Sequence, residues 1–280
     1  MLNNNPSTKG FVPVFNGYLY YEVRGSGMPV LFIHAGVADC SMWDDQFSYF
    51  SQYYRLIRYD TRGYGKSHTE TTEFSNRQDI VDLLTYLGVE KAAVIGISRG
   101  GQIAIDFTLE HPEFVSALIP IAAGVSGFDY QPGDNDQARR EFELFSHMDE
   151  LWEKKAYDEL AELEVHVWAD GPSQPVGRAS PQIRDYIHKF IRANYTRQDG
   201  KATPQPLSPP AAGRLGEIQV PTLILVGEYD TYDTLVMADK LNHEIPGVRK
   251  IIYPGTAHML PMEQSARFNQ EVLSFLGEVI

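Results

Sequence analysis

The sequence has a single cysteine, no long apolar run and fewer basic than acidic residues, and each shortage excludes a class of protein. Cys40 is the only cysteine among 280 residues, so no disulfide can form within the chain and nothing indicates an oxidising compartment. No apolar stretch approaches the ~18 residues that would span a membrane, and the first residues lack the basic and apolar regions of a signal peptide. We therefore expect a cytoplasmic protein.

Positive charge is scarce. Lys and Arg number 24 against 37 Asp and Glu, which gives a formal net charge of -13. A surface this negative repels polyanions, so we expect neither nucleic acid nor an anionic membrane as a partner. The hydrophobic share of 43% and the charged share of 22% are ordinary for a soluble globular protein. The chain is long enough for one large core, and a monomer or a homodimer is expected.

Short apolar runs alternate with helical patterns in both end regions of the chain. Helical stripes of apolar residues, such as those at 80–87 and 102–109, separate the apolar runs. Alternation of this kind is typical of βαβ units, and the fold class is therefore α/β, with a mostly parallel sheet flanked by helices. The predicted strands are 11–14, 18–23, 29–34, 55–59, 92–97, 117–122, 222–226 and 249–253.

The alternation stops in the middle of the chain. Between residues 128 and 213 no strand is obvious, and three apolar stripes follow the helical period. Pro- and Gly-rich segments flank these stripes, at Gln131–Gly133 and Pro204–Gly213. We predict an α/β core made of residues 1–127 and 214–280, with a helical cap inserted at 128–213.

The clearest chemical motif is Gly96–Gly100, which matches G-x-S-x-G between a predicted strand and a predicted helix. A sharp turn there lifts the Ser98 hydroxyl out of the sheet edge, and the flanking glycines avoid side-chain clashes. The helix that starts at Arg99 directs its free N–H groups towards the reacting oxygen. A glycine-rich turn with a capping serine is the alternative interpretation.

A serine nucleophile needs a base, and the base needs an orienting carboxylate. His258 follows the last predicted strand on a short loop, and Asp230 follows the strand before it. The order Ser98, Asp230, His258 therefore predicts a catalytic triad. Glu228 and Asp233 are rival candidates for the acid.

The oxyanion of such a reaction needs hydrogen-bond donors. One predicted donor is the backbone N–H of Arg99, and the other is the N–H of Gly36, with that of Val37 as the alternate. Removing one such donor typically costs ~3 kcal/mol of transition-state stabilisation. His34, just before this loop, is expected to fix the loop by hydrogen bonding rather than to take protons.

Together these motifs resemble the α/β-hydrolase superfamily over nearly the whole chain. The resemblance implies a cofactor-free serine esterase or lactonase with a helical cap, acting through an acyl-enzyme. Two departures are visible, because Ala35 stands where glycine is usual and Arg99 stands where many members have Met or Gln. The motifs that carry the resemblance are His34–Gly36 with Trp43, Asp60–Ser67, Gly96–Gly100, Gly227–Asp230 and Gly255–His258.

The expected substrate is a small or medium hydrophobic ester or lactone. The predicted pocket is lined by Val37, Phe145, Trp152, Trp168 and Tyr186. No His, Cys or carboxylate cluster has metal-ligand spacing, so no metal is expected. Three alternatives stay open: a hydrolase of carbon-carbon bonds in diketones, a receptor that keeps the fold, and perhydrolysis of a carboxylic acid as a side activity.

Overall fold

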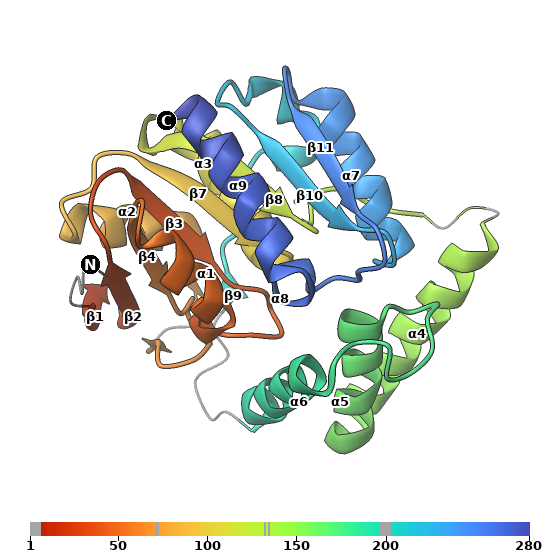
Figure 1. Cartoon of the computed structure of the whole chain (residues 1–280). Coiled ribbons are helices and arrows are strands. Elements are labelled where there is room, and N and C mark those ends of the chain that lie inside the picture. The colour runs from red at the N-terminus through yellow and green to blue at the C-terminus, as the bar shows by residue number, and fades with distance from the viewer. Residues whose placement is uncertain (1–6, 71–72, 132, 134, 197–202) are drawn as a thin grey trace.

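The structure is a computed structural model that describes residues 7–70, 73–131, 133, 135–196 and 203–280. Figure 1 shows a twisted sheet with helices on both faces and a further group of helices at one end. Each strand predicted from the sequence is present, with its ends within a few residues of the expected positions. The fold class is α/β, with a mostly parallel central sheet, as the sequence predicts.

The large sheet has the strand order β1-β2-β4-β3-β7-β8-β10-β11, with β5 paired to β2 outside this path. Pairing is antiparallel at the β1-β2-β4 edge and parallel from β4 to β11. The strands are β1 (Thr8–Val14), β2 (Gly17–Arg24), β3 (Pro29–Ile33), β4 (Arg55–Tyr59), β5 (His68–Thr69), β7 (Ala92–Ile97), β8 (Val115–Ile121), β10 (Leu223–Gly227) and β11 (Arg249–Tyr253).

Helices cover both faces because the central strands are apolar on both sides. Successive side chains of a strand point to opposite faces, so Leu31 and Phe32 of β3 enter different cores. Helices α1 and α9 pack on the Phe32 side, and α2, α3 and α7 pack on the Leu31 side. These helices are α1 (Asp44–Phe50), α2 (Asn76–Tyr86), α3 (Arg99–Glu110), α7 (Tyr232–Glu244), the short α8 (Leu260–Glu263) and α9 (Ser265–Val279).

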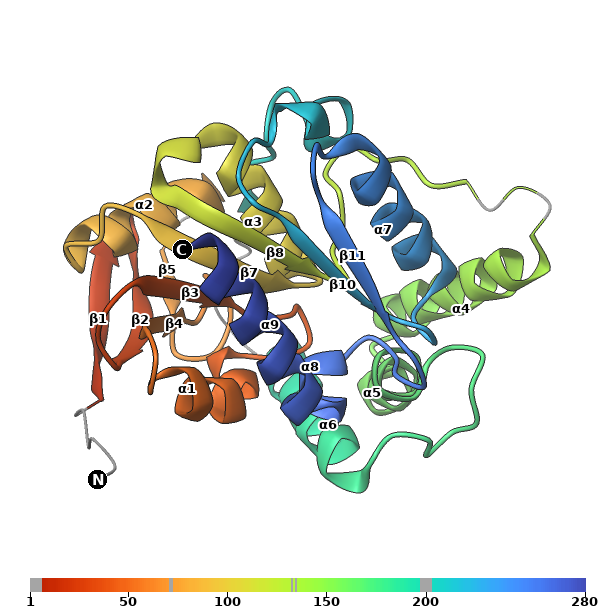
Figure 2. The same cartoon turned by 45° about the horizontal axis from the view of Figure 1, so that its top comes forward.

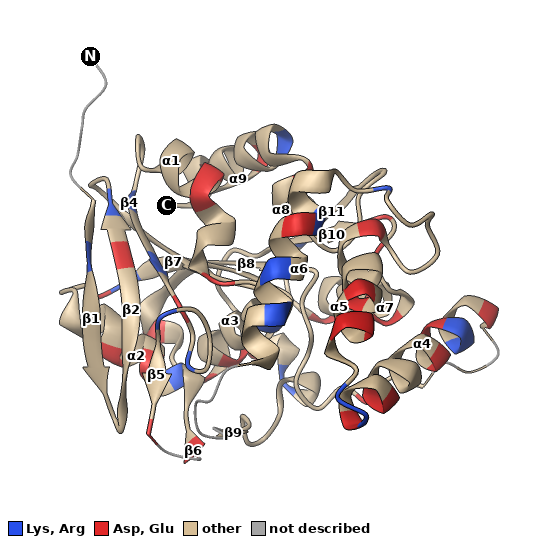
Figure 3. Ribbon diagram, turned by 90° about the horizontal axis from the view of Figure 1, so that it is seen from below, with Lys and Arg blue, Asp and Glu red and all other residues tan. Residues whose placement is uncertain are grey.

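The segment predicted as an insertion contains α4 (Asp136–Glu153), α5 (Tyr157–Val165) and α6 (Pro181–Tyr195). In Figures 1 and 2 these helices lie together at one end of the sheet. Figure 3 shows acidic residues on α5 beside basic residues on α6, and one such pair joins Arg192 to Asp158 at 3.0 Å. The division into a core and a cap at residues 128 and 213 stays a prediction.

One expectation about this segment is wrong, because it contains a strand. Strand β9 (Thr203–Pro204) pairs in parallel with β6 (Glu73–Phe74), and the Gln205 N–H donates to the Phe74 carbonyl at 2.7 Å. A two-residue strand that includes a proline is too short to give a pattern of alternating side chains. The pairing ties the end of the segment to the loop before α2.

Candidate active site

Ser98 stands between the end of β7 and the start of α3. Its backbone has φ 57° and ψ -123°, a conformation that residues with a side chain rarely adopt. The Ser98 N–H donates to the Ile121 carbonyl at 2.8 Å, and the Ser98 carbonyl accepts from the Gln102 N–H at 3.0 Å. The turn therefore holds the serine at the carboxyl end of the sheet.

The glycines on either side of this serine are required by close backbone approaches. A Cβ on Gly96 would lie 2.1 Å from the Gly100 carbonyl oxygen. A Cβ on Gly100 would lie 2.5 Å from the carbonyl oxygens of Ile33 and His34. Backbone atoms cannot yield as flexible side chains do, so the crossing of β3, β7 and α3 accepts only glycine at both positions.

Asp230 and His258 meet in a buried hydrogen bond. The two carboxylate oxygens of Asp230 lie 2.9 and 3.0 Å from His258 Nδ1, and both side chains are almost fully enclosed. The Thr231 N–H also donates to Asp230 at 2.8 Å. An ionised carboxylate accepts only, so Nδ1 carries the proton and Nε2 is left as the basic nitrogen.

The rival acids have other partners. Glu228 accepts from the Gly255 N–H at 2.8 Å and thereby joins the loop after β10 to the loop after β11. Asp233 accepts from the Thr234 N–H at 2.8 Å at the start of α7. Of the three acids weighed from the sequence, Asp230 is therefore the one that the structure brings to His258.

The loop after β3 is fixed by His34. The fully buried imidazole contacts the Ala35 carbonyl through Nδ1 at 2.7 Å and receives the Thr61 N–H at Nε2 at 3.0 Å. Burial lowers the pKa of His34, which favours the neutral ring. Gly36 lies beside Arg99, and a Cβ on Gly36 would lie 3.8 Å from the Arg99 Cβ. The two residues predicted to supply oxyanion donors are thus neighbours.

Four of the five predicted pocket residues lie next to His258 or in the region where α6 meets the loop after β3. The Trp168 ring lies 4.8 Å from the His258 ring, and Phe145 stacks on Trp168 at 6.0 Å. Tyr186 of α6 donates to Asp39 at 3.2 Å, in the loop that follows β3. Val37, in the same loop, packs partly buried against the core.

Trp152 lies apart from this group. It is 51% exposed, and its ring contacts the half-buried rings of Tyr157 and Tyr195 within the α4–α6 segment. The neighbouring Leu151 and Met148 fill the small core between α4 and α5 instead. The apolar stripe on α4 was therefore real, but Trp152 stands at its edge and faces outwards.

Sequence reasoning missed the ion pair that supports the histidine loop. Glu263 accepts from the Ala257 N–H at 2.9 Å and pairs with Arg178 at 2.7 Å, with both side chains mostly buried. Arg178 also donates to the Gly255 carbonyl at 2.8 Å. Neither residue belongs to a motif. The only signal in the sequence was that Glu263 is a charged residue shortly after His258.

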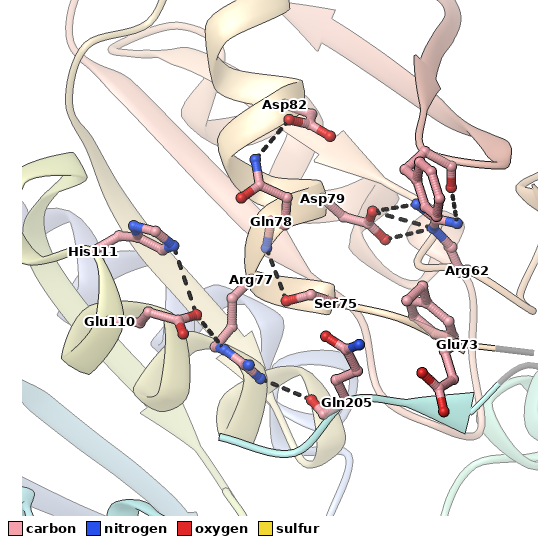
Figure 4. Close-up of a pocket in the computed structure, with 12 residues that line it drawn as sticks. Arg62, Glu73, Ser75, Arg77, Gln78, Asp79, Asp82, Glu110, His111 and Gln205 are labelled. Carbon is pink, nitrogen blue, oxygen red and sulfur yellow. Dashed lines mark hydrogen bonds and ion pairs between the residues drawn. The ribbon is translucent and has the colours of Figure 1, made fainter. Parts of the chain in front are cut away.

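A cavity of about 530 Å³ opens elsewhere on the molecule, and its lining includes none of the triad residues. Figure 4 shows that its two arginines, Arg62 and Arg77, pair with acidic side chains. Arg62 is held by Asp79 at 2.7 Å, and Arg77 is held by Glu110 and by the Gln205 carbonyl at 2.9 Å. The cavity therefore presents satisfied ion pairs rather than reactive groups.

The part of the chain that the structure describes contains neither a metal-ligand cluster nor a membrane-spanning helix. No group of three or more His, Cys, Asp or Glu side chains in this part of the chain could hold a metal ion. Within the same residues, every helix is too short or too polar to cross a bilayer.

Comparisons with known proteins agree with this geometry. A dienoate hydrolase of Comamonas testosteroni, 2-hydroxy-6-oxo-6-phenylhexa-2,4-dienoate hydrolase, is 24% identical and covers 93% of this chain and 91% of its own. The crystal structure of carboxylesterase CesB (YbfK) from Bacillus subtilis has a TM-score of 0.75 at 22% identity, covering 99% of this chain and 94% of its own. The enol-lactonase from Burkholderia xenovorans LB400 has a TM-score of 0.72 at 20% identity, covering 96% and 100%.

A family model also matches most of the chain. The sequence model of the alpha/beta hydrolase fold matches residues 28–265, which include the serine turn and the loops that carry Asp230 and His258. The strand order, the strained serine and the buried Asp230–His258 pair fit that match. The chain belongs to the alpha/beta hydrolase fold family.

Proposed function

We propose that this protein is a serine hydrolase that cleaves carboxylic esters or lactones. The proposal is carried by two features together: Ser98 is held at φ 57° at the carboxyl end of β7, and His258 is buried against Asp230 on the loops after β11 and β10. A nucleophile on a strained turn and an imidazole with a fixed tautomer are the two parts that acyl transfer needs.

In the proposed reaction the Ser98 hydroxyl attacks the ester carbonyl while His258 Nε2 takes its proton. The N–H groups of Gly36 and Arg99 stabilise the resulting oxyanion. His258 then protonates the leaving alcohol, and an acyl-serine remains. Water, activated by His258, hydrolyses the acyl-serine and releases the acid. Asp230 orients the imidazole and stabilises its charged form in both halves.

The proposed substrate pocket is apolar. The Trp168 ring lies against His258, and Phe145 stacks on Trp168. An acyl or alcohol group bound beside His258 would therefore contact aromatic faces. Val37 and Tyr186 complete the proposed lining from the loop after β3 and from α6. Trp152 is left out of this pocket because its side chain is half exposed and its ring contacts Tyr157 and Tyr195 instead.

The test is hydrolysis of p-nitrophenyl esters from C2 to C12, with Ser98→Ala as the paired control. We expect turnover by the wild type and a loss of about 10³-fold or more in kcat for the variant. The chain-length profile then measures the pocket. Turnover that survives in Ser98→Ala would reject Ser98 as the nucleophile.

A second candidate is hydrolysis of a carbon-carbon bond in a diketone. The similarity to 2-hydroxy-6-oxo-dienoate hydrolases over more than nine-tenths of the chain favours it. The same serine, histidine and oxyanion donors would serve that reaction. Loss of the dienoate chromophore without turnover of esters would favour this candidate. Thermal stabilisation by either compound without turnover would indicate a receptor.

A further inference from the structure

We propose that the Arg99 side chain is a positioning residue that acts through Thr61 and His34 on the peptide group carrying the Gly36 N–H. The inference rests on the proposed function in one respect, because it takes that N–H as an oxyanion donor. The Arg99 backbone N–H keeps its separate proposed role. The side chain would thus serve the second donor from a distance.

The direction of the hydrogen bonds follows from their chemistry. Arg99 Nη1 lies 2.8 Å from Thr61 Oγ1, and a guanidinium only donates. Thr61 Oγ1 therefore accepts from Arg99, which leaves its own proton for His34 Nε2 at 3.1 Å. The Thr61 N–H donates to the same nitrogen at 3.0 Å, so the two hydrogens share its single lone pair.

These contacts fix the tautomer of His34. Since Nε2 accepts, the proton of the neutral ring sits on Nδ1, which then donates to the Ala35 carbonyl at 2.7 Å. The Ala35 carbonyl also accepts from the Ala38 N–H at 3.2 Å, which closes the turn. A chain of donors thus runs from a permanent cation to one carbonyl oxygen.

That carbonyl belongs to the same peptide group as the Gly36 N–H. The peptide is planar, so a donor that holds the Ala35 oxygen also sets the direction of the Gly36 N–H. Hydrogen bonds in a chain polarise one another, and a peptide whose oxygen is so bound has a more positive N–H. This series of hydrogen bonds would therefore both orient the Gly36 N–H and make it a stronger donor.

The position of Arg99 suits this role. Its guanidinium lies 4.6 Å from the centre of the Tyr64 ring, and its Nη2 lies 3.5 Å from the Asn76 oxygen. Among the residues that the structure describes, no carboxylate lies within ion-pair distance of Arg99. Its charge is therefore not cancelled by a neighbouring anion, and its shortest polar contact is the one to Thr61.

The test compares Arg99→Met, Thr61→Val and the double variant on the best p-nitrophenyl ester. We expect each single change to lower kcat about tenfold with KM altered less than about twofold, because the donor acts on the transition state. The double variant should fall no further than either single one, because both break the same chain. Arg99→Lys should recover part of the loss, since it keeps a charged donor.

Two residues outside this series of hydrogen bonds provide matched control variants. Arg55→Met removes a guanidinium at the first residue of β4 that donates to the Leu87 carbonyl at 2.9 Å. Thr108→Val removes a buried hydroxyl of α3 that donates to the Ala104 carbonyl at 2.7 Å. Both should keep near wild-type kcat. Losses that multiply to about 100-fold in the double variant would overturn the proposal. So would a raised KM at unchanged kcat, which would indicate that Arg99 binds the substrate.

A second readout does not depend on turnover. The ¹⁵N NMR signals of the His34 ring should report a proton on Nδ1, and Arg99→Met and Thr61→Val should move the Nδ1–H signal in the same direction. A proton on Nε2, or no common shift, would reject the chain even in an active enzyme. Esterase activity that is independent of Ser98 would instead reject the proposed function and leave the NMR result to decide the chain.

Discussion

At the scale of single residues, Ser98 combines a chemical role with an unfavourable backbone. Residues with a Cβ pay about 1–3 kcal/mol to occupy such a region of φ and ψ, and the surrounding structure must impose it. Here the Ile121 carbonyl, the crossing glycines and the start of α3 impose it together. The strain is therefore located at the nucleophile itself.

This strain predicts that Ser98→Gly is more stable than Ser98→Ala. Glycine adopts φ 57° without strain, and part of the gain is offset by the greater freedom of glycine in the unfolded chain. We expect a net difference of about 1 kcal/mol in the free energy of unfolding, measured by urea denaturation. Both variants lack the hydroxyl, so neither should hydrolyse esters. Equal stability would show that the turn stores no strain at this residue.

The three proposed triad positions could be named from the sequence because each lies in a short contiguous motif beside a clear strand. It could not predict Arg178 and Glu263, whose partnership depends on how two distant segments fold together. The proposed role of Thr61 could not be predicted for the same reason, because it depends on contacts with His34 and Arg99 rather than on a motif. Contacts between distant side chains leave no local pattern of spacing.

At the scale of elements, the loops after β10 and β11 behave as one unit. The Tyr229 N–H donates to the Thr256 carbonyl at 2.8 Å, and a Cβ on Gly227 would lie 2.2 Å from the Ala257 carbonyl oxygen. Arg178, from the loop before α6, binds this unit through Gly255 and Glu263. The α4–α6 segment therefore supports the histidine from outside the core.

Glu263→Gln tests this support. The amide keeps an acceptor for the Ala257 N–H but loses the charge that holds Arg178, so the histidine loop should loosen. A small misplacement of a reacting group is costly, and we expect kcat to fall about three- to tenfold with KM nearly unchanged. Glu278→Gln is the control, because Glu278 pairs with Arg249 at 3.0 Å on the exposed surface. Equal activity of the two variants would show that Glu263 does not support the position of His258.

A second buried ion pair predicts a pH-dependent stability. Burial alone would raise the pKa of Asp170, but the N–H groups of Gly177 and Ala179 and the Arg184 guanidinium lower it below its ordinary value. A lowered carboxyl pKa stabilises the fold above the unfolded-state value near 4, and this contribution is lost as pH falls through the folded-state value.

We therefore expect Asp170→Asn to unfold about 2–4 kcal/mol more easily than the wild type at pH 7, because Arg184 loses its partner. The difference should shrink in urea titrations at about pH 3, where Asp170 gains a proton in the unfolded wild type. A difference that stays constant between these two pH values would contradict the assignment of the charged pair.

At the scale of elements the sequence was informative about long, regular patterns and silent about short ones. All eight predicted strands are present in the structure. They could be predicted because an apolar run between two turn signals is visible in the sequence itself. Strand β9 and the outward face of Trp152 escaped, because the first is two residues long and the second depends on how helices pack.

At the scale of the whole molecule, the sheet separates two large cores, and a small third cluster lies apart. Leu31 belongs to one of the large cores, whereas Leu151 of α4 belongs to the small cluster, which also contains the residues Met148, Leu160 and Val167. Global unfolding must break the large cores, but α4 can open by breaking only the small cluster and its contact with Tyr232 at the start of α7.

This arrangement predicts different outcomes for two Leu-to-Ala changes. Leu31→Ala should lower the free energy of unfolding by about 3–5 kcal/mol, because the sheet centre cannot collapse around the lost atoms. Leu151→Ala should change the global value by less than half as much while raising hydrogen exchange along α4. Denaturation paired with exchange measured by mass spectrometry separates the two. Uniform exchange in both variants would mean that the segment and the core unfold as one.

The contact between Trp168 and His258 gives the molecule a built-in optical signal. An excited indole loses its energy to a nearby imidazolium much faster than to a neutral imidazole, and the two rings lie 4.8 Å apart. The chain has three tryptophans, so replacing Trp43 and Trp152 by phenylalanine would leave Trp168 as the sole emitter. Its brightness would then follow the proton on His258 in real time, before and after an acyl group reaches Ser98.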